Sequence, residues 1–183
     1  YYLPNNAILV VAGNVTTEQV KQLCRKWFEP IPAGKDYVRN LPREQHQTQA
    51  RFEETTADVP LNALYKAYHM PGRFQAGYQA ADLLSDMLGR SKSSRLYQKL
   101  LKEQSLFSNV GAYITSSSDP GLLLVQGTLN EGVTLEEADA AVQGVLQEMV
   151  DNYVADEELT KVKNQAESTL AFSEVELLNR AMN

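Results

Sequence analysis

The segment from Met87 to Val110 constrains the fold of this chain more than any other stretch. Its pattern predicts the end of one helix, a Gly-Ser break, a second helix and the start of a strand. Gly89 lies where a helix often ends with a left-handed residue. Ser93 or Ser94 can accept a hydrogen bond from the first free N–H groups of the second helix. On both sides of this segment the chain repeats one format, in which strands are followed by helices.

The N-terminal part of the chain predicts one strand, one helix and one long loop. Residues 7–12 form a continuous apolar run, which is typical of a strand buried on both faces. Thr16 and Gln19 form a capping box in front of an amphipathic helix over residues 17–28. Residues 30–45 are polar and contain Gly and Pro, so we expect a loop that is long for a folded domain.

The rest of the chain predicts two strands and a helix, then a β-hairpin and two helices. These are strands over 48–55 and 61–70, a helix over 75–88, a hairpin of 107–115 with 122–129, a helix over 134–150 and a helix from Asp156 to the chain end. Consecutive strands joined by short turns predict an α+β fold, with a mainly antiparallel sheet and helices packed on one face. A doubly wound parallel sheet would need a helix between each strand and the next, and the spacing does not provide one.

Composition excludes several classes of protein. The net charge of −6 disfavours nucleic acid and anionic membranes as general partners. The single cysteine, Cys24, cannot form an intrachain disulfide, which leaves the compartment open. The sequence has no apolar run long enough to span a bilayer. The 183 residues suit one sizeable domain, and because the sequence begins at Tyr1 and stops within a helical pattern, we expect a piece of a longer protein.

No self-sufficient active site is visible in the sequence. A zinc peptidase needs three protein ligands, usually with two histidines one helical turn apart. The two histidines, His46 and His69, are far apart and neither has a second histidine at helical spacing. Cys24 falls on the apolar side of a helix, which favours a small buried side chain over a nucleophile. No nucleophile-elbow or phosphate-binding motif is present, so we expect no catalytic residue and no metal ligand in this chain.

Three segments resemble the pitrilysin/insulinase metallopeptidases, peptidase family M16. Residues 1–14 are similar to the family's Y-x-P-N-N strand, which ends in Gly and Asp or Asn. Residues 88–98 are similar to its L-G-x-x-x-S-S-R-L-aromatic segment, and residues 155–164 are similar to a helix that opens with acidic residues and ends in K-N. The resemblance is specifically to the family's repeated domain that lacks zinc, and it covers nearly the whole chain.

The resemblance implies a single C-terminal-type M16 domain over residues 1–183, cut from a longer chain at both ends. In that family two halves form a clamshell that encloses a peptide-sized chamber. The zinc site, H-x-x-E-H plus a distant glutamate, would lie in a domain that precedes Tyr1. The resemblance therefore implies that the parent is a zinc-dependent metalloendopeptidase and that this chain alone is inactive and binds no cofactor.

The implied partners are the preceding zinc-binding domain, a second clamshell half and a peptide substrate. The second half could belong to the same chain, to a second copy or to a paired subunit. The sequence leaves the compartment unknown, and we expect a bacterial protein of the cytoplasm or periplasm.

The family's second half also supplies an arginine and a tyrosine, seven residues apart, that help to bind the substrate. In this sequence Leu101 stands in the arginine position and Ser108 in the tyrosine position. A shift of one residue brings Leu100 and Phe107 there, again without an arginine. Arg95 is the remaining candidate for a chamber-facing charge, although an ion pair on the helix surface is the favoured alternative.

Three functions stay open at this point. The first is a non-catalytic domain that forms part of the chamber wall of an M16 peptidase. The second is a structural or assembly domain of an inactive M16-like subunit in a hetero-complex. The third is an unrelated ferredoxin-like domain that binds a ligand in a pocket of convergent polar groups.

Overall fold

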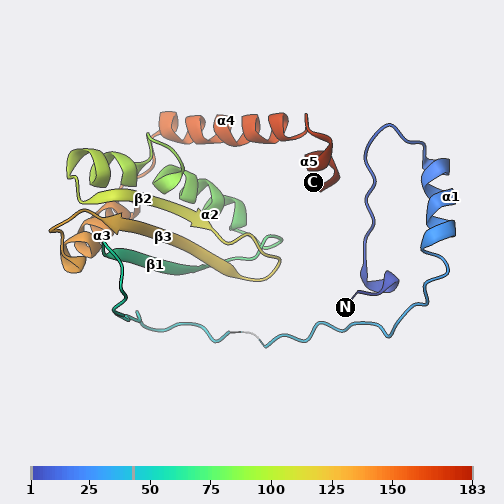
Figure 1. Ribbon diagram of the computed structural model, residues 1–183. Coiled ribbons are helices and arrows are strands. Elements are labelled where there is room, and N and C mark those ends of the chain that lie inside the picture. The colour runs from blue at the N-terminus through green and yellow to red at the C-terminus, as the bar shows by residue number, and fades with distance from the viewer. Residues whose placement is uncertain (1, 43, 183) are drawn as a thin grey trace. The chain divides into compact units, whose positions relative to one another are not determined.

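The computed structural model describes residues 2–42 and 44–182. Tyr1, which begins the first segment that resembles the family, lies outside the described residues. Asn183, the end of the expected domain, lies outside them as well. The chain divides into two compact units. Figure 1 shows the chain coloured by residue number from blue at the N-terminus to red at the C-terminus. Unit 1 contains the residues up to Thr55 together with those from Thr169 on, and unit 2 is Thr56–Ser168. A single domain over residues 1–183 therefore stays a prediction.

Unit 2 contains a three-stranded antiparallel sheet. Its strands are β1 (Ala63–Met70), β2 (Phe107–Ile114) and β3 (Gly121–Leu129), and their order in the sheet is β1-β3-β2 (Figure 1). The predicted hairpin is confirmed, because β2 and β3 pair directly. The predicted α+β class is confirmed as well.

The helices of unit 2 follow the strands in the predicted order. Helix α2 (Tyr78–Ser85) continues into the π-helical turn η2 (Asp86–Arg90), and a second helix ends in the wider turn η3 (Tyr97–Glu103). Helix α3 (Leu135–Asp151) and helix α4 (Asp156–Ser173) come after the sheet. The hydroxyl of Thr134 accepts a hydrogen bond from the N–H of Glu137 at 3.2 Å, as expected for the cap of α3.

One face of the sheet and the helices of unit 2 enclose a single main core. The strands contribute Phe107, Val110, Val125 and Leu129, and the helices contribute Leu88, Leu96, Leu100, Ala138, Val142 and Val145. Because the buried residues of β3 are every second residue, this strand presents only one face to the core. The core therefore forms on one side of the sheet.

Gly89 is needed for close packing and not for a left-handed turn, which corrects the expectation from sequence. Its φ is not in the left-handed region, and a Cβ at this position would lie 1.8 Å from the backbone nitrogen of Ala112. The end of η2 therefore rests directly on β2. The left-handed residue of this region is Ser105, with φ of 54°, and it ends the second helix where Leu106 donates its N–H to the carbonyl of Leu100 at 2.9 Å.

The expected cap by Ser93 or Ser94 is wrong. The hydroxyl of Ser93 bonds to the hydroxyl of Ser91 and to the ammonium of Lys161. The hydroxyl of Ser94 is buried and has no hydrogen-bond partner among the described residues. Ser94 supports the helix through its backbone, because its carbonyl accepts the N–H of Gln98 at 3.0 Å.

Unit 1 contains a short turn η1 (Pro4–Asn6), helix α1 (Thr17–Trp27) and helix α5 (Leu177–Met182). The capping box of Thr16 and Gln19 is confirmed by reciprocal hydrogen bonds. The helix expected to run from Asp156 to the chain end is interrupted, because α4 ends at Ser173 and α5 begins at Leu177.

Two predicted strands are absent from the described sheet, namely residues 7–12 and residues 48–55. Both segments are exposed. The sequence also predicts a buried side chain at Cys24 on the apolar side of α1, but Cys24 is only half-buried, and Leu23 and Trp27 beside it are exposed. The apolar patterns of these segments are typical of elements that pack on a core. None of the described residues of unit 1 is buried, so unit 1 does not provide such a core.

We predict that Gly89→Ala lowers the free energy of unfolding by about 3 kcal/mol, because the new methyl group collides with the backbone of β2. Urea unfolding followed by circular dichroism measures the change. The control is Gly144→Ala in α3, where a Cβ meets nothing within 4 Å and where we expect a gain of about 0.5–1 kcal/mol. Equal effects of the two substitutions would contradict the close contact.

Candidate functional site

The sheet face opposite the core is not covered by the helices of unit 2. We define this surface, the open face, by Tyr65 and Ala67 of β1, Leu124 and Gln126 of β3, and Tyr113 of β2. In each strand these residues alternate with core residues and therefore point to the other side of the sheet.

The open face combines aromatic rings with one polar group. Tyr65 lies opposite Gln126, and Tyr113 lies opposite Leu124 on the other side of β3. The hydroxyl of Tyr113 donates a hydrogen bond to Oε1 of Gln126 at 3.3 Å. Tyr65 is 70% exposed and Tyr113 is 44% exposed. Rigid rings with polar ends suit contact with a peptide or with another protein surface.

Tyr65 and Tyr113 are not among the candidates taken from the sequence. The signal that could have found them is the two-residue alternation of strands, which separates Tyr65 from the core residues Leu64 and Met70. The alternation sorts the strand residues into two faces but does not show which face is covered. The positions of the helices in the structure show that the face opposite Tyr65 and Tyr113 is the packed one.

Both outer strands leave one side of their backbone without a strand partner in the described sheet, because β3 lies between β1 and β2. An extended peptide can pair with such an edge through main-chain hydrogen bonds. Ser108 lies on β2, where its hydroxyl donates to the carbonyl of Thr128 at 3.1 Å. Leu101 packs against the main core. Their assignment to the positions of the family's tyrosine and arginine stays a prediction.

Arg95 makes a two-pronged ion pair with Glu158. Its Nε and Nη2 donate to the two carboxylate oxygens at 3.0 and 2.7 Å, and both side chains are largely buried. The hydrogen bond to Glu158 raises the pKa of the Arg95 guanidinium, so its charge is fixed. The pair joins the start of α4 to the helix that leads into η3. A substrate-binding role for Arg95 stays a prediction, and it would require this pair to open.

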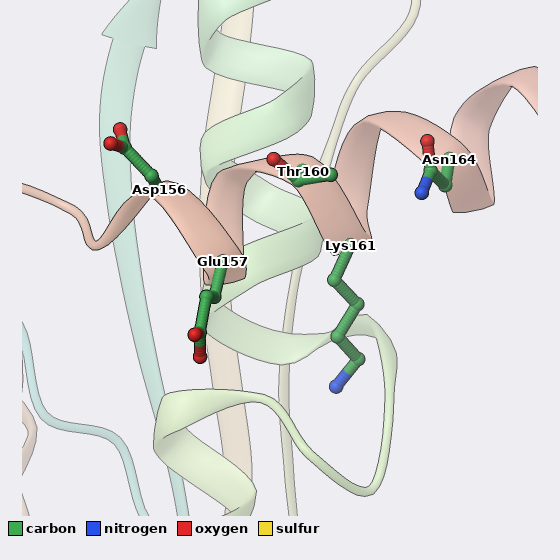
Figure 2. A pocket seen from close by; sticks show the side chains of 5 residues that line it. All are labelled: Asp156, Glu157, Thr160, Lys161 and Asn164. Atoms are coloured by element: carbon green, nitrogen blue, oxygen red, sulfur yellow. The ribbon is translucent and has the colours of Figure 1, made fainter.

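A shallow hollow lies along the first turns of α4 (Figure 2). It is lined by Asp156, Glu157, Thr160, Lys161 and Asn164, which all belong to this helix. Figure 2 shows Asp156 and Glu157 pointing away from each other, so their carboxylates do not converge on one point. Acidic residues in a first helical turn are explained by the helix dipole. We assign no ligand to this hollow.

The described residues do not fit a zinc site. Within 2–42 and 44–182, no group of three or more His, Cys, Asp or Glu side chains is placed to hold a metal ion. His46 is exposed, and its Nδ1 lies 2.8 Å from the carbonyl of Gln47. His69 lies on β1, opposite Leu122. A zinc site needs three convergent ligands, and these two histidines do not provide them.

The carboxyl group of Asp82 has a raised pKa. A shifted pKa can mark a functional site. Burial raises the pKa of Asp82 first, and the neighbouring carboxylate of Asp86 raises it further, whereas Arg90 and Arg73 oppose the shift. Asp86 itself is buried and paired with Arg90 at 3.0 Å. These contacts lie within the helical layer of unit 2, so the shift has a structural origin.

We predict that Asp82→Asn stabilises the protein at pH 7 by about 0.5 kcal/mol, because the substitution removes a like-charge pair four residues apart. The folded state binds the Asp82 proton more tightly than the unfolded state, so the wild type loses stability as the pH rises above the ordinary pKa of 3.8. Urea unfolding at pH 3 and pH 7 measures this. The gain should vanish at pH 3, and Glu131→Gln in an exposed turn should show no such pH dependence. A loss of stability at pH 7 would contradict the assignment.

For the Arg95–Glu158 pair we predict a coupling of about 1 kcal/mol in a double-mutant cycle with Arg95→Ala and Glu158→Ala. The free energies of unfolding of the four proteins give the coupling. The Lys99–Glu148 pair, which is more exposed, should give a smaller coupling in the same assay. A coupling of zero for Arg95 and Glu158 would leave Arg95 free for another role.

None of the helices within the described residues is long and apolar enough to cross a membrane. The fold and the open face together define an α+β domain, with a sheet covered by helices on one side. This class is matched by comparison with known proteins. The family model of the peptidase M16 inactive domain matches residues 1–166, and this chain belongs to that family.

The relatives are named as zinc proteases. The chain is 28% identical to zinc protease PqqE of Helicobacter pylori over 166 residues, and 28% identical to the uncharacterized zinc protease YmxG of Bacillus subtilis over 177 residues. These matches cover 89% and 94% of the chain but only 37% and 41% of the relatives. A crystal structure of a protease from Helicobacter pylori shares the fold, with a TM-score of 0.84 and 22% identity over 99% of this chain and 45% of that one.

Proposed function

We propose that this chain is a non-catalytic domain of an M16-type zinc metallopeptidase, and that its open face forms part of the wall of a chamber that encloses peptide substrates. The observation that carries the proposal is the one-sided packing of the sheet. Helices cover one face, whereas Tyr65, Leu124 and Tyr113 remain accessible on the other. In a wall, this accessible face would contact the peptide.

The proposal assigns the chemistry to another part of the protein. The zinc site, with the motif H-x-x-E-H, would lie in a preceding domain, and the bound metal would supply an activated water for attack on the peptide carbonyl. Family membership and the zinc-protease names of the relatives support this arrangement. A second clamshell half, from the same chain, a second copy or a paired subunit, would close the chamber. The role of unit 2 would be shape and peptide contact.

The alternative is an assembly domain of an inactive M16-like subunit in a hetero-complex. The exposed apolar residues of unit 1, such as Trp27 and Phe28, favour contact with another protein surface. In that case the open face would bind a subunit and not a peptide. Peptidase activity of the full-length protein separates the two functions.

We predict that Tyr65→Ala and Tyr113→Ala in the full-length protein each reduce kcat/KM for a peptide substrate by about 3- to 10-fold, since each removes an aromatic contact. Zinc content and thermal stability should stay the same. Steady-state kinetics with a fluorogenic peptide and metal analysis measure these quantities. Tyr153→Ala is the matched control, because Tyr153 is fully exposed between α3 and α4 and should have no effect.

Two outcomes would contradict the wall function. The first is unchanged kcat/KM in both open-face variants. The second is a full-length protein that hydrolyses no peptide but elutes as a stable hetero-complex in size-exclusion chromatography, which would support the assembly domain.

A further inference from the structure

The three strands of the described sheet carry a single Asp, Glu, Lys or Arg side chain, which is Lys66 of β1. Lys66 alternates with the open-face residues Tyr65 and Ala67, so it lies on the helix side of the sheet. There its ammonium group pairs with the carboxylate of Asp139 in α3. The open face is therefore free of these four residue types.

This lack of charge is unusual for a sheet face that its own helices leave uncovered. Charged residues make up 22% of the chain, and the solvated face of an antiparallel sheet is commonly polar. The residues that continue the face along the strands add one histidine and no other acidic or basic group, and they are Ala63, His69, Asn109, Leu122 and Thr128. The pattern therefore indicates contact with an uncharged partner.

The chemistry of the open face discriminates between side chains by charge. A charged side chain buried against this face loses its hydration, and the face has no opposite charge that offsets the loss. Aliphatic and aromatic side chains gain from the same contact, for which Tyr65 and Tyr113 supply rigid rings. The hydroxyl of Tyr113 orients the amide of Gln126 through the bond to Oε1, and the N–H groups of a glutamine amide can donate to a peptide carbonyl. The face can therefore hold the main chain of a peptide while it rejects charged side chains.

We propose that the open face selects uncharged segments of a peptide, rich in aliphatic or aromatic side chains, and disfavours segments that contain Lys, Arg, Asp or Glu. This inference rests on the proposed function, since it names the class of peptide that the wall would contact. A second copy of the chain suits the face less well. Two copies that each carry a net charge of −6 repel each other, whereas an uncharged peptide meets no such repulsion.

Peptide binding to the full-length protein, in the presence of a chelator that prevents cleavage, tests the selection. Fluorescence anisotropy gives the Kd of labelled peptides that share identical flanks and differ in a central block of leucine and phenylalanine, of glutamine, of lysine or of glutamate. We expect the Kd of the lysine and glutamate peptides to be on the order of 10-fold higher than that of the leucine–phenylalanine peptide, with the glutamine peptide between them. Equal Kd values for the four peptides, or no binding of any, would overturn the inference.

A substitution that adds one charge to the open face locates the effect. Gln126→Glu keeps an acceptor oxygen for Tyr113 and should lower the Kd of the lysine peptide and raise that of the glutamate peptide, each by about 5-fold, with little change for the leucine–phenylalanine peptide. The matched control is Ala140→Glu at an exposed position of α3, which should change none of the Kd values. An equal change for all four peptides, or the same changes in the control, would contradict the inference.

Peptidase activity of the metal-loaded protein separates this inference from the proposed function. Hydrolysis of all four peptides with equal kcat/KM and equal Kd would overturn the inference without contradicting the wall function. Selective binding without hydrolysis of any peptide would contradict the peptidase function and support the selective face. Kd values that rise with protein concentration, as a dimer appears in sedimentation, would assign the face to a second copy and overturn the inference.

Discussion

The contact between the end of η2 and the backbone of β2 determines how unit 2 is built. At Gly89 the helical layer approaches the sheet so closely that no side chain fits between them. This approach brings Leu88 and Leu96 to the core face of the sheet, where both are almost completely buried. The two helices on either side of residues 91–94 can then cover the same face, and the opposite face is left to solvent or to a partner.

The elements of unit 2 could be predicted from sequence because their signals are local. The capping residue Thr134, the turn before Gly121 and the acidic first turn of α4 each act within a few residues of the chain. Such signals do not depend on which surface the element finally meets. The role of Gly89 does depend on it, since its nearest neighbour, Ala112, is distant in sequence. A local rule therefore predicts a left-handed turn at Gly89, whereas its close packing against β2 can be recognised only in the three-dimensional structure.

The same distinction explains the errors in unit 1. The backbone hydrogen bonds of a strand are made by a neighbouring strand. The apolar run at residues 7–12 therefore indicates a strand, but it does not indicate which strand would pair with it. The candidate site shows a related limit. The face with Tyr65 and Tyr113 follows from alternation, but its accessibility depends on where all the helices lie. Arg95, which a sequence motif suggested, faces an acid from a helix that begins much later in the chain, at Asp156.

The two outer strands of the sheet have a practical consequence for isolated forms of this domain. In the sheet formed by the described residues, strands β1 and β2 each present one row of main-chain donors and acceptors without a strand partner. Such rows attract any extended chain, including a misfolded copy of the same polypeptide. The isolated domain should therefore lose solubility as it is concentrated, and short edge-capping peptides or added surface lysines should delay precipitation.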